Sequence, residues 1–315
     1  MEDGMRGKSI LITGGTGSFG NAFVDRLLTL EPKRIVIYSR DEHKQETMAR
    51  RLGAWGVDHP VLRFFIGDVR NPDRLEMAMH GIDTVVHAAA MKIVPTAEYN
   101  PTECVATNIT GAENVIRASI RAGVSKVLAL STDKAVNPVN LYGATKLAAE
   151  KIFIAANALS AGSCRFSVMR YGNVVGSNGS VVPVFRRLLA DGSPITITDQ
   201  RMTRFWITMP QAVAWARFCL DDMIGREIFV PKIPSVRIMD LAEAIGIGRY
   251  TFTGIRPGEK LHEALISPEE APVAEEHKDF FRLHPTGTAV GGRGYAYTSD
   301  KNEFLTVDQI KETIK

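Results

Sequence analysis

Two pairs of chemically active residues lie close together in the segment STDKAVNPVNLYGATKLAAEK, residues 131–151. Tyr142 and Lys146 are four residues apart, and on a helix this spacing places both side chains on one face. A lysine ammonium near a phenol lowers the phenol pKa from its usual value of about 10, which makes the tyrosine a usable base near neutral pH. Asp133 and Lys134 could supply a further acid and base. A polar loop that caps a helix is the plainer interpretation of the same residues.

A glycine-rich stretch near the N-terminus could bind a dinucleotide. It follows the apolar run SILIT, has the spacing GxxGxxG and precedes the helical pattern NAFVDRLLTL. Glycines there allow a tight turn and a close approach to a pyrophosphate, whose charge the helix N-terminus attracts. A glycine-rich turn without a ligand is the alternative, but the strand before and the helix after are the context that the motif requires. The cofactor contacts expected from this loop are Gly14, Thr16, Gly17, Ser18, Phe19 and Gly20.

The end of the second apolar run, RIVIYSRDEHK, bears on the choice of dinucleotide. NAD-binding folds usually place an acidic residue there, whereas this chain has Ser39 and Arg40, with Lys44 one turn further. A guanidinium can pair with a 2′-phosphate, which favours NADP, and Asp41 keeps NAD as the second choice. Further cofactor contacts are expected at the ends of the next two strands, from Asp68, Val69, Ala88, Ala89 and Lys92.

The elements that must position these residues follow a regular alternation. Short apolar runs alternate with segments of helical periodicity, which predicts an α/β fold with a Rossmann-like, doubly wound parallel sheet. We assign residues 1–172 to an NADP-binding domain and expect a strand near 227–231 to return to its sheet. Residues 173–315, with more turns and shorter helices, are expected to form most of a smaller, interleaved α/β lobe that binds substrate. The runs assigned to strands of the first domain are 9–13, 34–39, 61–68, 83–89, 126–132 and 165–176.

Composition and charge argue against several other classes of protein. The 315 residues include 45% hydrophobic and 23% charged residues, and the formal net charge is only +3. No run of basic residues interleaved with aromatics indicates nucleic-acid binding, and no apolar run reaches the roughly 20 residues that span a bilayer. The N-terminus is too short and polar for a signal peptide, so we expect a cytoplasmic protein. We assign no metal site. Three widely spaced cysteines are expected to be free thiols: Cys104, Cys164 and Cys219.

Taken together, the motifs resemble a known group of enzymes. The glycine loop, Thr132 and the Tyr142/Lys146 pair resemble the extended short-chain dehydrogenase/reductase superfamily over nearly the whole chain. Five longer motifs closely resemble the UDP-N-acetylglucosamine 4,6-dehydratases: AAAMKIVPTAEYNP, TDKAVNPVNLYGATK, YGNVVGSNGSVVPVF, MTRFW and RPGEKLHE. The resemblance implies UDP-N-acetylglucosamine as substrate, a homo-oligomer (dimer or hexamer) and a role in pseudaminic acid biosynthesis.

The resemblance also implies a role for each residue of the 131–151 segment. Tyr142 takes the proton of the 4-hydroxyl while hydride leaves C4, with Thr132 bound near the 4-oxygen and Lys146 beside the cofactor. Asp133 acts as acid toward the C6 oxygen and Lys134 as base toward C5, after which hydride returns to C6. A neutral amine is needed, so we expect a lowered pKa for Lys134. Deoxythymidine-diphosphate-glucose dehydratases have TDE where this chain has TDK.

Stereochemistry and substrate contacts are likewise implied by resemblance. Relatives that retain the configuration at C5 carry methionine in place of Tyr142, so the chain resembles the inverting group, whose product is UDP-2-acetamido-2,6-dideoxy-β-L-arabino-hex-4-ulose. Arg204 and Arg256 are expected to bind phosphate oxygens and Glu259 the uridine ribose. The full set of expected substrate contacts is Lys92, Asn173, Val181, Arg204, Arg256 and Glu259.

Three other functions remain open. A configuration-retaining 4,6-dehydratase would use the same residues with another protonation face. A UDP-sugar 4-epimerase would need Tyr142 and Lys146 but no acid and base for dehydration, so the TDK triplet argues against it. An NADP-sensing binding protein on the same fold would need none of these groups together.

Overall fold

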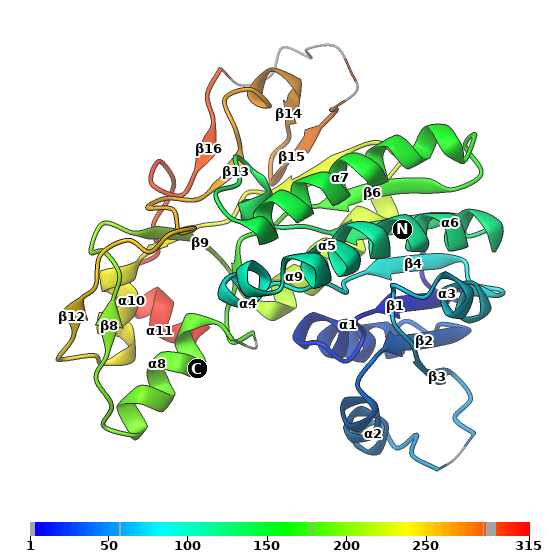
Figure 1. Ribbon diagram of the computed structural model, residues 1–315, viewed down its shortest axis with the longest axis horizontal. Helices are drawn as coiled ribbons and strands as arrows, with labels where there is room; N and C mark the ends of the chain where they lie inside the picture. The colour runs from blue at the N-terminus through cyan, green and yellow to red at the C-terminus, as the bar shows by residue number, and fades with distance from the viewer. Residues whose placement is uncertain (1–3, 57, 178, 286, 288–293) are drawn as a thin grey trace.

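The central element of the fold is one large, mostly parallel sheet. The computed structural model describes residues 4–56, 58–177, 179–285, 287 and 294–315. Within them, nine strands pair in the order β14-β15-β10-β6-β5-β4-β1-β2-β3 (Figure 1). The parallel strands are β1 (Ser9–Thr13), β2 (Arg34–Ser39), β3 (Leu62–Ile66), β4 (Thr84–His87), β5 (Lys126–Leu130), β6 (Arg165–Met169) and β10 (Ile228–Pro231). Antiparallel β15 (Phe280–Leu283) and β14 (Ala274–Glu276) extend one edge.

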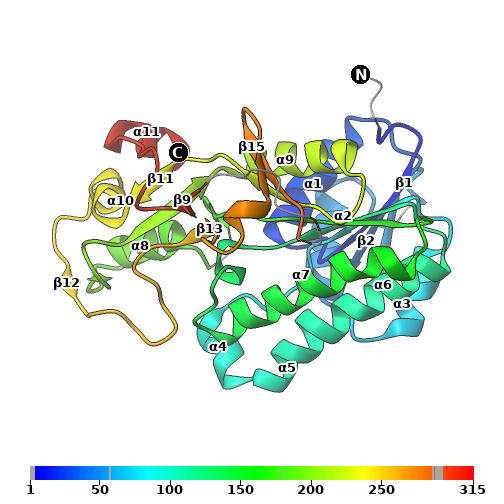
Figure 2. The ribbon, with the colours of Figure 1, turned by 90° about the horizontal axis from the view of Figure 1, so that it is seen from above.

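Helices cover both faces of this sheet, so the predicted doubly wound α/β fold is confirmed (Figure 2). One face carries α1 (Ser18–Leu28), α2 (Glu42–Arg51) and α9 (Met209–Asp222). The other carries α3 (Pro72–Met79), α6 (Gly111–Arg121) and α7 (Leu141–Leu159). The crossover from β4 to α6 contains α4 (Val94–Tyr99), α5 (Pro101–Val105) and a π-helical turn, η1 (Ala106–Thr110).

The apolar runs become strands because they can bury both of their faces. All five residues of β1 are buried, and side chains alternate between the two faces with the period of two that a strand imposes. Leu11 packs in the core beneath α3, α6 and α7, while Ile10 and Ile12 pack beneath α1 and α9. Side chains of the neighbouring strands alternate in the same way, so each face of the sheet contributes to one of two hydrophobic cores.

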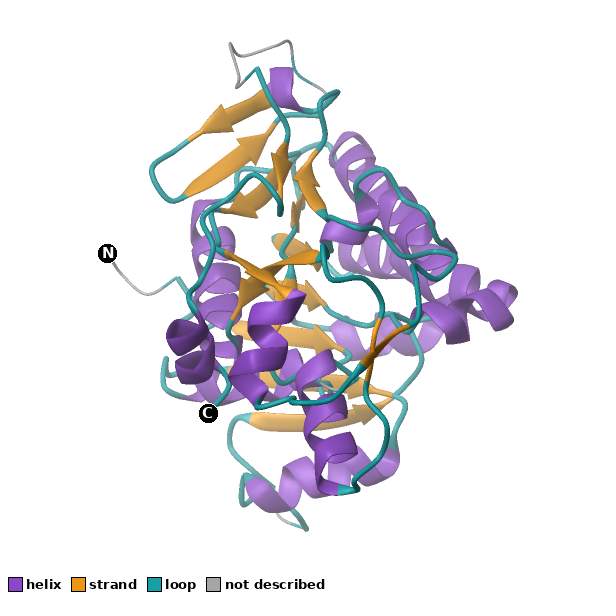
Figure 3. Ribbon diagram, turned by 90° about the vertical axis from the view of Figure 1, so that its left-hand side faces the viewer, coloured by secondary structure: helices purple, strands orange, loops and turns teal. Residues whose placement is uncertain are grey.

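The remaining elements form a smaller lobe beside the large sheet, drawn at the left of Figure 1 and facing the viewer in Figure 3. Its three-stranded sheet contains β11 (Ser235–Arg237), β9 (Thr203–Ile207) and β7 (Asn173–Val174). Its helices are α8 (Val181–Ala190), α10 (Ile238–Ile245) and α11 (Val307–Thr313). Two small pairs join β8 (Thr196–Ile197) to β12 (Thr251–Phe252) and β13 (Ala264–Ile266) to β16 (Tyr297–Thr298), and the short helix η3 (Ala271–Val273) precedes β14. The chain enters this lobe after β6 and returns to the large sheet at β10. After β10 it leaves the large sheet and enters the smaller lobe again at β11.

A fully buried arginine connects the large sheet to helix α7 and to the segment after β13. Arg170, directly after β6, donates to both carboxylate oxygens of Glu150 on α7, at 2.9 and 2.7 Å. It also donates to both oxygens of Glu270, at 2.9 and 2.7 Å, and to the Leu265 carbonyl at 3.1 Å. Fork-shaped pairing of this kind fixes orientation as well as distance. The helix that carries Tyr142 is thereby held to the C-terminal lobe.

None of the described helices is long and apolar enough to cross a membrane. The described residues also contain no group of three or more His, Cys, Asp or Glu side chains that could hold a metal ion. All three cysteines are free and buried.

Candidate active site

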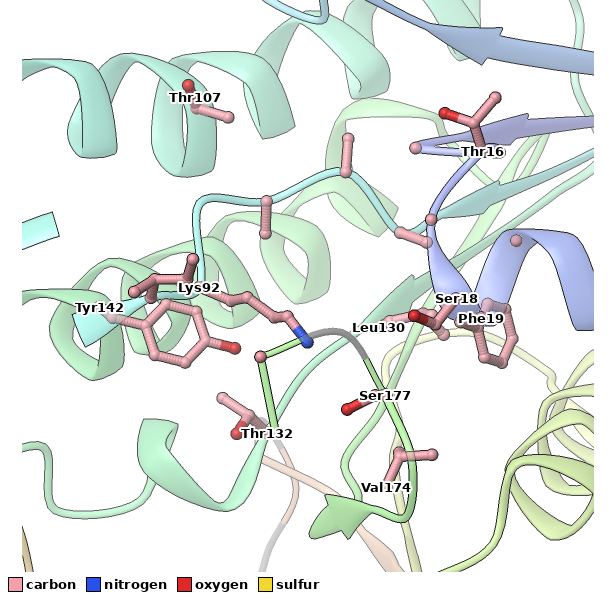
Figure 4. A pocket seen from close by; sticks show the side chains of 18 of the residues that line it. Thr16, Ser18, Phe19, Lys92, Thr107, Leu130, Thr132, Tyr142, Val174 and Ser177 are labelled. Atoms are coloured by element: carbon pink, nitrogen blue, oxygen red, sulfur yellow. The ribbon is translucent and has the colours of Figure 1, made fainter. Parts of the chain in front are cut away.

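A cleft of about 720 Å³ opens where the parallel strands end. Its walls come from the β1–α1 loop, the ends of β2 to β5, the start of α7 and the segment after β6, which is where open α/β sheets bind ligands. Figure 4 looks into this cleft: Tyr142, Thr132 and Lys92 lie on one side, and Thr16, Ser18 and Phe19 on the other. A second pocket of about 220 Å³ shares Lys134 and Asn173 with it.

The glycine loop has the tight geometry that its spacing predicts. Gly14 has a φ of +66°, and a Cβ there would lie 2.9 Å from the Ala89 backbone. A Cβ on Gly20 would lie 2.3 Å from the Gly15 carbonyl oxygen, so only glycine lets α1 pack against the loop. Gly17 is the N-cap of α1 and makes no side-chain cap hydrogen bond, and a helix N-terminus of this kind favours an anion.

The residues expected at the adenosine end also line the cleft. Asp41 caps α2 by accepting from the Lys44 N–H at 3.0 Å, and its carboxylate pairs with the Lys44 ammonium at 3.1 Å. The Arg40 guanidinium is largely exposed and lies 3.6 Å from Asp68. Asp68 does not cap α3, because Asn71 does so. The cleft is lined by all the loop and strand-end residues expected for a cofactor: Gly14, Thr16, Gly17, Ser18, Phe19, Gly20, Ser39, Arg40, Lys44, Asp68, Val69, Ala88, Ala89 and Lys92.

A buried asparagine fixes the backbone beside Lys92. Asn108, in η1, accepts from the Met91 N–H at 2.8 Å and donates to the Met91 carbonyl at 3.0 Å. It also donates to the Thr145 hydroxyl on α7 at 3.0 Å. Lys92 has a lowered pKa, because desolvation and the charge of Lys134 both disfavour its ammonium form. Sequence reasoning did not find Asn108, since a π-helical turn within a helical pattern leaves no clear signal.

The Thr132–Lys134 triplet forms a short hydrogen-bonded unit at the end of β5. The Thr132 hydroxyl donates to Asp133 Oδ1 at 2.8 Å, and Lys134 Nζ donates to the same oxygen at 3.1 Å. The Asp133 side chain is 1% exposed, and its Oδ2 has no hydrogen-bond partner among the described residues. The unit (η2, Asp133–Ala135) lines the cleft next to Tyr142. Asp133 and Lys134 therefore both line the cleft beside Tyr142.

Tyr142 and Lys146 occupy the first turns of α7, but only the tyrosine reaches the cleft. Asn140 caps the helix by accepting from the Gly143 N–H at 2.7 Å. Burial raises the pKa of Tyr142 to about 12, against the lowering effects of the Lys134 charge and of a hydrogen bond with Thr132. Lys146 lies behind the cleft wall and donates to the Leu130 carbonyl at 2.6 Å. Burial lowers its pKa to about 8, which a nearby glutamate partly offsets.

Two expectations about these pKa values were wrong for the structure as it stands. The pKa of Tyr142 is raised by burial and not lowered, and the ammonium that opposes this rise belongs to Lys134 and not to Lys146. The pKa of Lys134 itself is raised and not lowered. Desolvation favours its neutral form, but the carboxylates of Asp133 and Glu263 outweigh that effect.

The expected substrate residues divide between two environments. Arg256 and Glu259 line the second pocket with Asn173, and their side chains lie 3.9 Å apart. Arg204 lines it too, but its guanidinium already donates to the carbonyls of residues 203, 260 and 261. Val181 lines neither pocket and packs against the apolar cores of the smaller lobe.

Glu263 and Lys260 also line the second pocket, although sequence reasoning singled out neither. Both lie within RPGEKLHE, so the motif pointed to the right segment. The signal that was missing is spatial, because Lys134 and Arg204 approach Glu263 only in the folded chain.

Buried polar atoms without a hydrogen-bond partner gather around the two pockets. Leaving such an atom unpaired costs about 1–3 kcal/mol, so each one needs an explanation. A polar ligand would supply the missing partners, which fits a dinucleotide and a sugar nucleotide. Among the described residues that line the pockets, the unpaired side-chain atoms belong to Thr107, Ser131, Asp133, Asn173, Ser180, Glu259 and Glu263.

Known proteins resemble this chain over almost its whole length. A UDP-N-acetylglucosamine 4,6-dehydratase (inverting) from Campylobacter jejuni is 50% identical, over 94% of this chain and 93% of its own. A UDP-glucose 4-epimerase from Rickettsia conorii is 41% identical, over 98% and 95%. The X-ray structure of Pen from Bacillus thuringiensis superposes with a TM-score of 0.91 at 35% identity, over 98% of this chain and 97% of that chain.

A family model supports the same relationship. The model described as "Polysaccharide biosynthesis protein" matches residues 10–285, which include all the described residues that line the two pockets. Because the matched region covers most of the sequence, the chain belongs to the polysaccharide biosynthesis protein family.

Proposed function

We propose that this protein is an inverting UDP-N-acetylglucosamine 4,6-dehydratase. The observation that carries the proposal is the Asp133–Lys134 pair in the same cleft as Tyr142, since water elimination needs an acid and a base beyond the tyrosine. The 50% identity to the Campylobacter enzyme over nearly the full length supports the substrate and the inversion. The expected product is UDP-2-acetamido-2,6-dideoxy-β-L-arabino-hex-4-ulose.

The residues of the cleft fit a nicotinamide dinucleotide. The glycine loop and the N-terminus of α1 would hold the pyrophosphate, and Lys146, which donates to the Leu130 carbonyl behind the cleft, would support the wall at the nicotinamide end. The choice of NADP rests on Arg40, whose largely exposed guanidinium lies beside the cleft, 3.6 Å from Asp68, and could pair with a 2′-phosphate, while Asp41 is engaged as the cap of α2. When bound, the cofactor accepts hydride from C4 and returns it to C6.

The chain's own groups then move protons at three atoms of the sugar. Tyr142 takes the proton of the 4-hydroxyl, and the Lys134 ammonium helps by favouring the phenolate. Transfer of the Lys134 proton to Asp133, 3.1 Å away, would leave the amine neutral, and the amine then takes the C5 proton that the neighbouring ketone has made acidic. Asp133 gives its proton to the departing C6 oxygen, which leaves as water, and Thr132 orients both Asp133 and the 4-oxygen. After hydride returns to C6, a solvent proton adds to C5 from the opposite face, which balances the proton that Tyr142 later releases. Arg256, Glu259 and Asn173 hold the uridine diphosphate in the second pocket.

Mass spectrometry of the product tests this function against its rivals. Incubation of the purified protein with UDP-N-acetylglucosamine should give a sugar nucleotide lighter by one water molecule. A product of unchanged mass that co-elutes with UDP-N-acetylgalactosamine would instead favour a 4-epimerase, the second candidate, which the similarity to the Rickettsia proteins supports. No turnover of any UDP-sugar would favour a binding protein.

Arg40→Ser should weaken NADP binding about 10-fold or more, because a hydrogen bond to a charged group contributes about 1.5–3 kcal/mol. NAD binding should change little, since NAD lacks the 2′-phosphate. Titration of protein fluorescence with each dinucleotide measures both affinities. Arg26→Ser, at an exposed arginine on α1, is the matched control and should affect neither. Equal losses for NADP and NAD in R40S would contradict the assignment of NADP.

We propose four further features, of which the first and third come from the sequence pattern and the other two from the family resemblance. They are the division into a dinucleotide domain, residues 1–172, and an interleaved substrate lobe, residues 173–315, with β10 returning to the sheet of the first; a homo-oligomer, dimer or hexamer; a cytoplasmic location; and a role in pseudaminic acid biosynthesis. Sedimentation equilibrium measures the oligomer, and a monomer at micromolar concentration would contradict that part.

A further inference from the structure

Glu263, just before β13, is a buried carboxylate surrounded by cations. Its side chain is 4% exposed, and Oε1 lies 3.7 Å from Lys134 Nζ and 3.8 Å from Arg204 Nε. Oε2 lies 3.9 Å from Lys260 Nζ and has no hydrogen-bond partner in the described part of the chain. A buried carboxylate normally carries strong hydrogen bonds, and this one has three nearby positive charges instead. Burial nevertheless raises the pKa of Glu263 above its ordinary value, which the three cations only partly offset.

Glu263 is held in place by its own segment. Its backbone N–H donates to the Ser299 hydroxyl at 2.9 Å. Lys260 donates to the Val136 carbonyl at 2.5 Å, and Asn140 donates to the Gly258 carbonyl at 2.8 Å. The RPGEKLHE segment is therefore fastened to the loop between Lys134 and α7.

Lys134 thus lies between two carboxylates that come from different parts of the chain. Asp133 Oδ1 is 3.1 Å from its ammonium and belongs to the same short helix, whereas Glu263 Oε1 is 3.7 Å away. An anion within about 4–6 Å stabilises the protonated form of a lysine. The ionisable groups that interact with Lys134 or Glu263 are Asp133, Arg204, Lys260, Tyr142 and Lys92.

We propose that Glu263 is a positioning residue that retains the proton on Lys134 and so sets the lowest pH at which Lys134 can act as a base. The base role itself rests on the proposed function. The effect of Glu263 on the lysine proton does not, because it follows from the 3.7 Å separation and the burial of the carboxylate. Glu263 also links the second pocket to the acid–base pair, since it lines that pocket beside Arg204 and Lys260.

The sign of the effect is fixed by electrostatics. Desolvation lowers the pKa of Lys134, and the carboxylates of Asp133 and Glu263 raise it above its ordinary value. Glu263→Gln removes one of these negative charges and keeps a side chain of nearly the same size. The apparent pKa of Lys134 should therefore fall by about one unit or more. The rise of kcat with pH that accompanies loss of the lysine proton should move to lower pH by the same amount, while KM changes little.

Competitive acetylation with acetic anhydride measures the lysine proton without any need for turnover. The yield of acetylated Lys134, read by mass spectrometry across a pH series, gives its apparent pKa in the wild type and in E263Q. A fall in E263Q supports the proposal, and an unchanged or higher pKa overturns it. A rate lowered equally at every pH, with no shift of the Lys134 titration, also overturns it and would make Glu263 merely structural.

Two variants separate this effect from general damage. Glu227→Gln alters another fully buried carboxylate, which accepts from Ser167 Oγ at 2.9 Å and lies at the start of β10, and should leave the pKa of Lys134 unchanged. Glu263→Asp keeps the charge and should keep the pKa above that of E263Q. If E263Q does not fold, a lowered pKa in E263D, whose carboxylate stands further back, supports the proposal, and the wild-type value overturns it.

The same measurements distinguish failure of the proposal from failure of the proposed function. A Lys134 titration that shifts in E263Q, in a protein that does not dehydrate UDP-N-acetylglucosamine, would reject the dehydratase and keep the Glu263 effect. If the wild type dehydrates UDP-N-acetylglucosamine and the Lys134 titration is unshifted in E263Q, the dehydratase assignment stands and the Glu263 effect is rejected.

Discussion

Lys134→Ala should lower the rate of dehydration of UDP-N-acetylglucosamine by about 10²–10⁴-fold, the usual contribution of a general base. The variant lacks the only group assigned to remove the C5 proton, so exchange of that proton with solvent should stop as well. Cofactor and UDP should still bind, because the glycine loop and the Arg256–Glu259 side of the second pocket are untouched. Proton NMR of the reaction and calorimetric titration with UDP measure the two properties separately.

Lys134→Arg is the informative partner of that variant. An arginine keeps a positive charge beside Asp133 and Glu263 but does not deprotonate in proteins. We therefore expect Lys134→Arg to be as inactive as Lys134→Ala in the dehydration of UDP-N-acetylglucosamine. Dehydration at the wild-type rate in either variant would show that Lys134 is not the base, and activity in the arginine variant alone would mean that only its charge matters.

Arg170→Leu should destabilise the protein by about 3–5 kcal/mol, the cost of removing one partner from a buried ion pair. The change leaves the carboxylates of Glu150 and Glu270 without the cation that they share. Equilibrium unfolding in urea measures the difference in the free energy of unfolding. Arg165→Leu, at an exposed arginine at the start of the same strand, should cost no more than about 0.5 kcal/mol. Similar small losses in both variants would contradict the role of Arg170.

The loss caused by Arg170→Leu should also depend on pH. Burial raises the pKa of Glu270, but the hydrogen bonds and the charge of Arg170 together lower it by a larger amount, so the pKa lies below its ordinary value. A carboxylate with a lowered folded-state pKa contributes stability above its ordinary pKa of about 4.3, and that contribution is lost as the pH falls through the folded-state value. The difference between wild type and variant should therefore shrink in acid. A constant difference from pH 7 down to pH 3 would contradict this explanation.

The fold class and much of the cleft could be predicted from local sequence. A five-residue apolar run such as SILIT is typical of a strand that is buried on both faces. The φ of +66° at Gly14 is a conformation that glycine adopts most easily, so the glycine itself indicated the turn. The helical pattern that begins at Leu141 correctly indicated the helix that carries Tyr142 and Lys146. These features depend on neighbours in the sequence, which is why spacing was enough.

Long-range electrostatics could not be obtained in this way. The pKa of Lys134 was expected to be lowered, but Asp133 beside it raises the pKa, and so does Glu263, which approaches from a distant part of the chain. Arg204 has the right chemistry for phosphate, yet the fold surrounds it with carbonyl oxygens. The antiparallel edge strands β14 and β15 were missed too, because AEE and FFRL mix charged with apolar residues and resemble a loop.

The most direct test of the central claim is proton NMR of UDP-N-acetylglucosamine incubated with the purified protein in deuterated water. The account predicts a 4-keto-6-deoxy sugar that carries deuterium at C5 and shows the coupling pattern of the L-arabino configuration. D-xylo couplings would contradict the inversion and place the protein with the retaining dehydratases. A signal from UDP-N-acetylgalactosamine without a 4-keto sugar would contradict dehydration itself.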